Sequence, residues 1–462
     1  MKPGIKSHFI FWSSFIIAVI IIVTSWQLET NLGADVRIME GTAHYVNLNL
    51  PFVYMRASRD NVVCLNGNPL SKKAIQILAP VHLEALSLGE VELELSLFGL
   101  IPLRLVTVNI LPEVRLVPGG NSIGIRLNSR GVTVVGYYYF ESEGQNRSPS
   151  REAGVRVGDV ITAIDGEQIT SINQAANLLG RTDREPGGPV LLTMVRDGHK
   201  KTISVTPLYS ELDGGYRIGL YIRDSAAGVG TLSFYDPATG RYGALGHIIV
   251  DADTNKPVDL RDGNIVKAQI VDIKSAQRGK PGEKTGIFID QGSFKGNIEQ
   301  NTPYGIFGRL DSFLPSQEAI PMALVSQVEI GPAEMLTVIE GETIGHFQVE
   351  IERLAPQSRP SDKGFIIRVI DEELLAVTGG IVQGMSGSPI IQQGRIVGAV
   401  THVFINDPTR GYGIFMEWMY QEAGNYQQIK DKENRRCKGW EDCNFRRREG
   451  IFPRMSKIQS MT

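Results

Sequence analysis

The sequence predicts a mainly β protein built from several domains. Its 462 residues exceed the length of a single hydrophobic core, since domains usually span about 100 to 200 residues. Short apolar runs with period-two alternation, such as 91–95 and 103–108, are bounded by Gly, Pro or Asn, as is typical of strands. One stretch differs, because residues 8–26 are apolar and contain no charged side chain. We therefore expect an N-terminal transmembrane helix followed by β-rich domains.

Residues 1–29 are expected to form a cytoplasmic N-terminus and a transmembrane anchor. The apolar run is about long enough to cross a bilayer as a helix. Lys2 and Lys6 precede it and favour a single-pass orientation in which the chain after Glu29 is exported. A cleaved signal peptide is the alternative, but it would have a shorter apolar region followed by small residues.

Composition excludes several classes of partner and site. The chain is 42% hydrophobic and 21% charged, and its formal net charge of −3 provides no field to attract nucleic acid, so no nucleic-acid partner is expected. Cys64, Cys437 and Cys443 are too few for a disulfide framework or a zinc site, although the last two could close a small loop. We expect no metal and no cofactor.

The rest of the chain divides into four predicted parts. Residues 30–111 read as a small β-rich region without evident chemistry, and residues 112–210 as a second unit. Residues 211–420 are rich in Gly and in short apolar runs, which favours one or two β-barrels over alternating strands and helices. Residues 421–462 are polar and basic, so we expect a disordered tail.

The second unit, 112–210, resembles a PDZ domain. The specific part is 153–161 (Ala-Gly-Val-Arg-Val-Gly-Asp-Val-Ile), which is followed by a predicted helix at 171–179. A PDZ domain binds an extended peptide by adding it to an exposed sheet edge. We expect this loop and strand at Ser122, Ile123, Gly124 and Ile125, where the glycine allows close approach of the peptide backbone. The alternative is that the unit only packs against its neighbour.

The segment 384–389 (Gly-Met-Ser-Gly-Ser-Pro) has the features of a nucleophile turn. A catalytic serine needs a base and amide donors for the oxyanion, and therefore a tight turn that glycine permits. Here Ser386 is the candidate nucleophile, and the backbone N–H groups of Gly384 and Ser386 are the candidate oxyanion donors. Strand-like runs flank the turn, an order similar to that in the C-terminal barrel of chymotrypsin-like peptidases.

The base should be a histidine. His247 lies upstream of the serine in a small-residue turn, where a trypsin-like order of histidine, aspartate and serine would place it. We expect His402 to pack behind the site and His346 to lie on a strand surface. Spacing does not choose the orienting carboxylate, for which five residues are available: Asp251, Asp253, Asp362, Asp371 and Asp407.

These residues resemble the SpoIVB family, the stage IV B sporulation serine peptidases of endospore-forming bacteria. The resemblance rests on residues 223–232, 243–247, 379–390 and 401–409, and on the order of anchor, intervening region, PDZ domain and peptidase domain. It implies catalysis by Ser386 and His247 and favours Asp371 as the third member of the triad.

The resemblance also implies a biological role. Members of the family look like self-processing proteases in the forespore membrane that face the space between the two membranes. They cleave a membrane-bound regulator and thereby activate an intramembrane protease that matures a late sigma factor. The implied partners are a protein substrate in a membrane complex, the chain's own N-terminal region and a PDZ-bound peptide.

Two other functions fit parts of the sequence. A membrane-tethered PDZ scaffold with an inactive peptidase-like domain would not need Ser386. A periplasmic quality-control protease would share the chemistry but would have a released N-terminus.

Overall fold

The computed structural model describes residues 12, 15, 19, 21–26, 35–41, 43–46, 52–77, 81–180, 185–290, 294–311, 318–356 and 359–424. Over these residues the chain is mainly β, as predicted. Most of the expected anchor at 1–29 lies outside them, and no described helix combines the length and apolar character needed to cross a membrane. The expected tail also lies outside them beyond Gly424, including Cys437 and Cys443.

The N-terminal unit consists of two sheets with strand orders β1-β9-β8-β3-β6 and β2-β7-β4-β5. Buried and less buried residues alternate along β3 and β7, which places one face of each strand in a shared apolar core. These strands are β1 (Asp35–Met39), β2 (Ala43–Val46), β3 (Val53–Ala57), β4 (Val63–Leu65), β5 (Asn68–Pro69), β6 (Ile75–Gln76), β7 (Val81–Ala85), β8 (Gly89–Leu97) and β9 (Ile101–Leu111).

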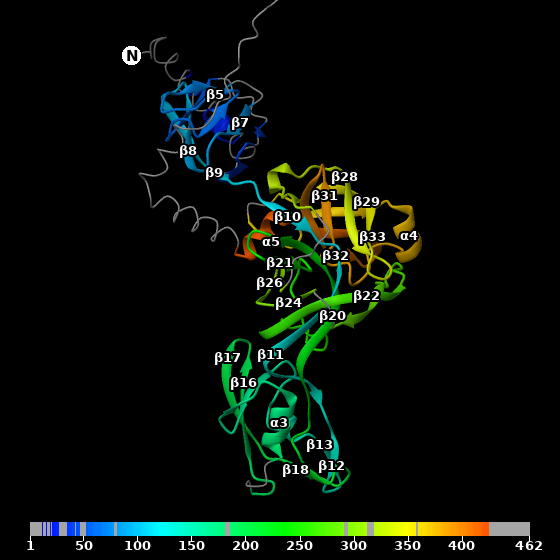
Figure 1. Ribbon diagram of the computed structural model, residues 1–462. Coiled ribbons are helices and arrows are strands. Elements are labelled where there is room, and N and C mark those ends of the chain that lie inside the picture. The colour runs from blue at the N-terminus through cyan, green and yellow to red at the C-terminus, as the bar shows by residue number, and fades with distance from the viewer. Residues whose placement is uncertain are drawn as a thin grey trace, which may run out of the picture.

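Three long strands connect the rest of the molecule: β11 (Ser122–Tyr137), β20 (Leu220–Asp236) and β22 (Leu260–Lys274). The first half of β11 lies between β20 and β22, and its second half lies between β14 and β20. The pairing of β11 with β20 shifts register between Asn128 and Thr133, which marks the passage from one unit to the next. Figure 1 shows β11 and β20 running from the middle of the molecule into its lower part, whereas β22 stays in the middle.

The first barrel is formed by the strand series β24-β22-β11-β20-β21-β26, and a bridge between Gly296 and Leu310 joins the ends of the series. Its apolar core includes Ile123, Leu232 and Tyr242. The additional strands of this barrel and its margin are β10 (Arg115–Pro118), β21 (Arg241–Ala244), β23 (Glu283–Ile289), β24 (Lys295–Asn297), β25 (Gln300–Thr302), β26 (Gly305–Arg309) and β27 (Ile320–Pro321).

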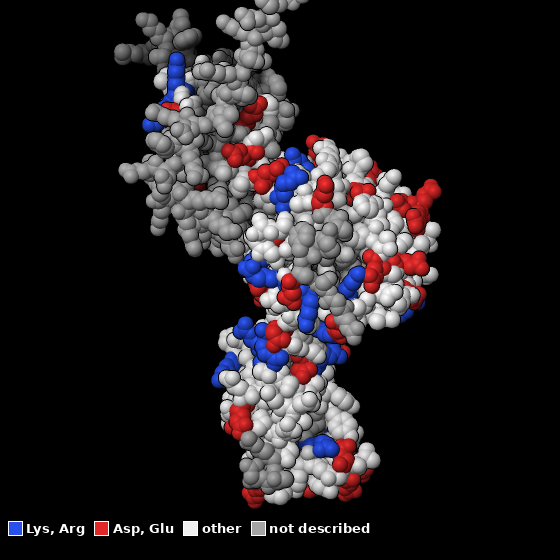
Figure 2. Space-filling view, viewed as in Figure 1, with Lys and Arg blue, Asp and Glu red and all other residues white. Residues whose placement is uncertain are grey.

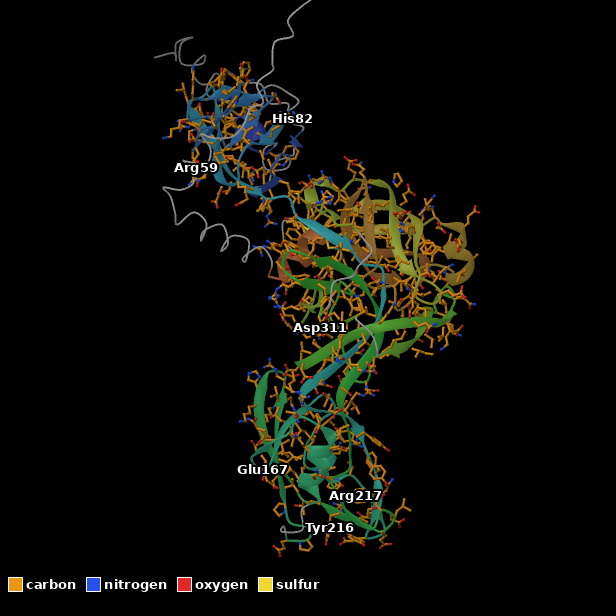
Figure 3. The ribbon with its side chains drawn as sticks, viewed as in Figure 1. Arg59, His82, Glu167, Tyr216, Arg217 and Asp311 are labelled. Carbon is orange, nitrogen blue, oxygen red and sulfur yellow. The ribbon has the colours of Figure 1, made fainter. Side chains whose placement is uncertain are left out.

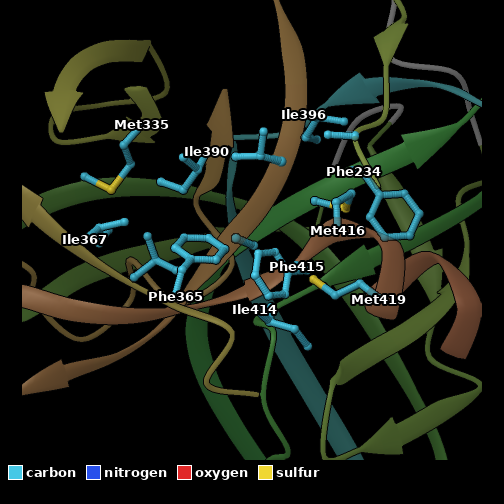
Figure 4. Packing of buried hydrophobic residues seen from close by; sticks show 14 of the residues in the cluster. Phe234, Met335, Phe365, Ile367, Ile390, Ile396, Ile414, Phe415, Met416 and Met419 are labelled. Atoms are coloured by element: carbon cyan, nitrogen blue, oxygen red, sulfur yellow. The ribbon is translucent and has the colours of Figure 1, made fainter. Parts of the chain in front are cut away.

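The second barrel is closed and confirms the predicted β-barrel, with the order β28-β29-β30-β33-β32-β31. Figure 4 shows its core, where the rings of Phe365 and Phe415 lie 5.3 Å apart beside Ile390 and Ile414. Its elements are η1 (Val325–Gln327), β28 (Gly331–Val338), β29 (Ile344–Leu354), β30 (Phe365–Val369), α4 (Glu372–Thr378), β31 (Pro389–Gln392), β32 (Arg395–Phe404), β33 (Asp407–Phe415) and α5 (Met416–Glu422).

A further unit, which we call the inserted unit, spans residues 132–223. It begins in the second half of β11 and ends in the first residues of β20. Its sheet has the order β17-β16-β14-β11-β20, and α3 packs on its apolar core. Its elements are β12 (Phe140–Ser142), β13 (Gln145–Arg147), α2 (Pro149–Glu152), β14 (Val160–Ile164), β15 (Glu167–Gln168), α3 (Ile172–Leu179), β16 (Val190–Arg196), β17 (His199–Val205), β18 (Leu208–Ser210) and β19 (Gly215–Arg217).

Strand pairing in this arrangement crosses both predicted limits of the second unit, 112–210. Its first residues pair inside the first barrel, whereas Leu220–Arg223 pairs with the inserted unit although it was expected in the peptidase domain. The physical reason is that β11 and β20 each run through both units. A domain boundary therefore falls inside a strand, where no Gly- or Pro-rich linker signals it.

Ion pairs lie at the junction of the inserted unit with the first barrel. Lys256 Nζ lies 3.0 Å from Asp197 Oδ1, and charged side chains of both signs gather at this neck in Figure 2. Tyr216 and Arg217 lie toward the opposite end of the inserted unit, far from the barrels (Figure 3).

Candidate active site

The turn that carries Ser386 is held from both barrels. Gly384 and Gly387 both have φ of +94°, a conformation that favours glycine. A Cβ atom on Gly387 would lie 2.1 Å from the Thr231 carbonyl oxygen, so no larger residue fits there. Thr231, in β20 of the first barrel, donates its N–H to the Ser386 carbonyl (3.0 Å) and its hydroxyl to the Gly384 carbonyl (2.7 Å).

Two amide donors of this turn remain available. The neighbouring N–H groups are used inside the fold, because Met385 donates to Val382, Gly387 to Val400 and Ser388 to Met385. Among the hydrogen bonds of the described residues, none uses the N–H of Gly384 or of Ser386. Both residues line the cavity described below, which is the arrangement that an oxyanion hole requires.

His247 follows β21 after a turn in which Leu245 and Gly246 have φ near +70°. Its Nδ1 lies 2.9 Å from the carbonyl oxygen of Ile248. A carbonyl only accepts hydrogen bonds, so Nδ1 carries the proton and Nε2 is left as the acceptor. Burial lowers the pKa of His247, and the opposing effects of the Ile248 carbonyl and the Asp362 charge are smaller. The ring is therefore a neutral base at neutral pH.

Ser386 and His247 line one cavity of about 910 Å³ between the two barrels. The Ser386 hydroxyl donates to the carbonyl of Thr401 (2.9 Å) and forms no hydrogen bond with His247 in the described structure. The serine is therefore in a resting position, from which its side chain must rotate to reach the imidazole. Such loose geometry is common in substrate-free sites.

Among the described residues that line this cavity, Asp362 is the one carboxylate. It is partly buried, lines the cavity, and its charge acts to raise the pKa values of both His247 and His402 against the larger effect of burial. The Thr401 hydroxyl donates to the Asp362 carbonyl (3.0 Å), which links this residue to the strand beside the serine. Sequence spacing left Asp362 as one of five possibilities.

The structure does not bring Asp371 to His247, which corrects that prediction. Asp371 is the N-cap of α4, where its Oδ1 accepts the N–H of Leu374 (3.0 Å) and its Oδ2 accepts the N–H of Gln348 (3.1 Å). Asp371 is also absent from the described cavity lining. Its position before Glu372 and Glu373 is typical of a helix start, a signal that the sequence carried.

The other candidate carboxylates have partners elsewhere. Asp251 accepts hydrogen bonds from Thr254 and forms an ion pair with Arg223 (3.2 Å). Asp253 also forms an ion pair with Arg223 (2.7 Å). Asp407 pairs with Arg410 (3.1 Å). None of the three lines the described cavity.

The remaining histidines take different positions. The ring of His402 lies 5.0 Å from that of His247 at a tilt of 38°, so it flanks the base at the cavity. Burial, followed by the proximity of His247, lowers the pKa of His402. His346 lies on the surface of β29, 3.0 Å from Glu334. The described residues contain no cluster of His, Cys, Asp or Glu suited to a metal ion.

Residues 214–420 match the family model of the SpoIVB peptidase S55, which covers both the serine turn and His247. The chain carries an S55 peptidase domain of the SpoIVB family. A PDZ model matches residues 142–186, within the inserted unit. The resemblance to the SpoIVB family with a PDZ domain is confirmed, and the chain is a serine peptidase.

Comparison with solved structures finds two forms of the Rv3671c protease from M. tuberculosis. The active form is 15% identical and covers 43% of this chain and 73% of its own, with a TM-score of 0.25. The inactive form is 15% identical and covers 42% of this chain and 84% of its own, also with a TM-score of 0.25. A search of curated proteins gives no match.

The S55 and PDZ domains share their long strands, and this overturns the predicted peptide-binding residues. Ser122, Ile123, Gly124 and Ile125 are buried and pair with β20 on one edge, and Ile123–Ile125 also pair with β22 on the other. A Cβ atom on Gly124 would lie 2.6 Å from the Phe288 ring, so its glycine serves packing. With both edges occupied, this segment cannot accept a peptide strand.

A different segment provides the open edge of the PDZ domain. Leu220–Arg223 at the start of β20 pairs with β11 and, among the described strands, with no other. Helix α3 contacts β20, and the carboxylate of Asp224 accepts the N–H of Ile172 at the start of α3 (2.9 Å). Ile218-Gly219-Leu220 repeats the Ile-Gly-aliphatic pattern of Ile123-Gly124-Ile125, so the sequence contains this pattern twice.

Proposed function

We propose that this serine peptidase is a membrane-anchored endopeptidase of sporulation signalling that processes itself and cleaves a membrane-bound regulator. In this proposal Ser386 is the nucleophile, His247 the base and Asp362, in place of Asp371, the carboxylate of the site. The observation that carries the catalytic part is that Ser386 and His247 line one cavity with two unused amide donors.

The reaction begins when the Ser386 hydroxyl rotates from the Thr401 carbonyl toward His247. As Oγ attacks the scissile carbonyl, its proton passes to Nε2 of His247, the nitrogen left unprotonated by the contact of Nδ1 with Ile248. The developing oxyanion accepts hydrogen bonds from the N–H groups of Gly384 and Ser386. His247 then returns the proton to the leaving amine, and water hydrolyses the acyl-enzyme by the same steps.

Asp362 acts through its charge on the imidazolium that forms during this cycle. A negative charge near the ring favours its protonated form and so offsets the effect of burial, which disfavours that form. The Ile248 carbonyl holds the tautomer in the resting site, a task that the aspartate performs in trypsin-like sites.

We propose further that a peptide binds the PDZ domain along Leu220–Arg223. Strand addition requires an unpaired edge, and this edge has one, with α3 beside it. Hydrogen exchange of the full chain with added C-terminal peptides should slow at residues 220–223. Slowing at 122–125 with none at 220–223 would reverse this assignment.

The biological setting rests on the family and on the sequence. The name of the matched family refers to sporulation. The apolar run at 8–26 supports a membrane anchor that places the S55 domain outside the cytoplasm, at the forespore membrane. The proposed partners are a protein substrate in a membrane complex and the chain's own N-terminal region. Release of the S55 domain after self-processing is an alternative final location. Membrane fractionation before and after self-cleavage distinguishes a retained anchor from a released protein.

The decisive test compares self-cleavage of wild type, Ser386→Ala and Ser388→Ala in a chain that begins near residue 30. Ser388 lies in the same turn but is fully buried, so it is a matched control. We expect Ser386→Ala to lose cleavage and Ser388→Ala to retain it. Identical fragments from wild type and Ser386→Ala, with no activity on a membrane-bound candidate substrate, would eliminate the proposal and favour the inactive PDZ scaffold.

A further inference from the structure

A hairpin of the first barrel reaches across to the serine turn in the second barrel. β22 and β23 pair from Lys267–Ile289 to Lys274–Glu283, and the end of this hairpin contacts the segment before Ser386. Gln383 donates its N–H to Gly282 (2.9 Å) and accepts the N–H of Lys284 (2.9 Å). The residue next to the proposed oxyanion donor Gly384 is therefore fixed by a strand of the other barrel.

Lys284 on this hairpin is buried although it carries an amine. Its exposed fraction is 2%, and its Nζ donates to the hydroxyl of Thr337 in β28 at 2.7 Å. The groups around it are uncharged: Ile273 lies across the hairpin, Thr337 on β28, and Gln383 and Gly384 on the serine turn. Among the described residues, no carboxylate forms an ion pair with Lys284; the nearby Glu283 is paired with Lys274 instead (3.8 Å).

The stem of Lys284 lies directly under Gly384. A Cβ atom placed on Gly384 would lie 3.1 Å from Cβ, 3.4 Å from Cγ and 3.3 Å from Cδ of the lysine. The lysine therefore fills the space on one side of Gly384 and restricts movement of its peptide group. A shift of that group would misalign the N–H that faces the oxyanion.

The charge state of the amine decides whether this support is stable. A charged amine has three donors, and the described contacts supply one acceptor. Burial without a counter-charge strongly disfavours the ammonium form and lowers the pKa of Lys284 to about 7. Protonation in acid would thus favour conformations in which the side chain leaves its site toward water.

We propose that Lys284 is a positioning residue that holds the oxyanion donor Gly384 in place and does so only while its amine is uncharged. This inference rests on the proposed roles of Ser386 and Gly384. It makes the peptidase sensitive to acid through a residue that does not touch the substrate, in addition to the titration of His247.

The first test measures pH profiles of self-cleavage and of labelling by a fluorophosphonate, which reacts with an activated serine. In the wild-type full chain we expect activity to fall as pH drops through about 7, the pKa of Lys284. Lys284→Met has a similar length and no charge, so its activity should persist to below pH 6.5, where His247 alone sets the limit. Lys274→Met, at an exposed position on the partner strand, is the control and should follow wild type.

The second test removes the partner of the amine and leaves the lysine in place. Thr337→Val keeps the shape of the side chain and deletes the acceptor, so labelling at pH 8 should slow by about tenfold as the oxyanion donor loses its alignment. A change in kcat without a matching change in KM distinguishes this effect from loss of substrate binding. This variant also decides the matter if Lys284→Met does not fold.

Unchanged pH profiles in Lys284→Met, or an unchanged labelling rate in Thr337→Val, would overturn the role of Lys284. Ser386→Ala is measured in parallel. If Ser386→Ala is inactive while the lysine and threonine variants behave as wild type, the positioning role fails and the catalytic assignment stands. If Ser386→Ala is as active as wild type, the catalytic assignment itself fails.

Discussion

The Ser386 hydroxyl has to leave the Thr401 carbonyl before it can attack a substrate. Breaking one hydrogen bond of this kind costs about 1 kcal/mol, which a bound substrate can offset by occupying the same cavity. The resting position thus gives a small barrier against attack in the empty site. Sequence could place the serine on a glycine turn but could not reveal which acceptor its hydroxyl selects.

Substitutions of Asp362 and Asp371, the two aspartates considered for the site, should have different effects on activity and stability. Asp362→Asn should reduce kcat/KM about tenfold, because the imidazolium loses a nearby negative charge while the Ile248 carbonyl still holds the tautomer. Asp371→Ala should cost about 0.5 to 2 kcal/mol of stability through loss of the α4 cap and should leave the chemical step unchanged. Labelling rates and urea unfolding measure the two effects.

The reverse result would restore the assignment suggested by the family. If Asp371→Asn, which retains a good capping side chain, abolished labelling while Asp362→Asn did not, Asp371 would be the functional carboxylate. The α4 cap would then have to rearrange in the active form.

At the scale of elements, the hairpin that carries Lys284 should make stability depend on pH. The unfolded lysine has its ordinary pKa of 10.5 and the folded one about 7, so between these values the unfolded chain binds more protons. Stability should therefore rise with pH in this window. Urea unfolding at pH 7 and pH 9 should show that the free energy of unfolding rises more in wild type than in Lys284→Met. Equal changes in the free energy of unfolding of the two proteins would contradict the burial of a neutral amine.

Sequence predicted the kinds of element better than their pairing. The strands, the serine turn and the PDZ signature depend on local patterns, and the structure or the family match agrees with each. The open PDZ edge depends on which of two similar strings, at Gly124 and at Gly219, lies between two neighbouring strands. That is a long-range property, and local sequence does not encode it.

Lys284 shows the same limit for a single side chain. Its strand begins with the polar run Glu283-Lys284-Thr285 and has no period-two pattern, so nothing nearby predicts burial of the lysine. Only the approach of the second barrel encloses the amine. A buried lysine of this kind can be found from coordinates and not from composition.

At the scale of the molecule, the N-terminal unit is attached to the S55 domain through Arg37. Its Nη1 lies 2.7 Å from the buried carboxylate of Glu417, and its guanidinium lies 5.2 Å from the centre of the Trp418 ring. Glu417, in α5, also accepts the N–H of Val325 in η1 (2.8 Å), so its carboxylate connects Arg37 with both of these elements of the second barrel.

Removal of Arg37 should loosen this attachment. Arg37→Ala leaves Glu417 buried with its positive partner missing, so we expect a lower melting temperature and faster limited proteolysis near residues 111–114. Arg56→Ala, in an exposed pair with Glu94 in the same unit, is the control and should change little. Equal proteolysis of both variants would show that other contacts hold the two parts together.

The course of β11 and β20 through two domains makes the PDZ domain a removable module. Asn128 and Ser225 are paired neighbours on adjacent strands, only about 5 Å apart, at the place where the chain leaves the first barrel and returns to it. A tight turn could join them directly, and the barrel strands on either side would keep their partners. The PDZ domain thus occupies the place of a hairpin loop between two barrel strands, and the same place offers a site at which another domain could be exchanged for it.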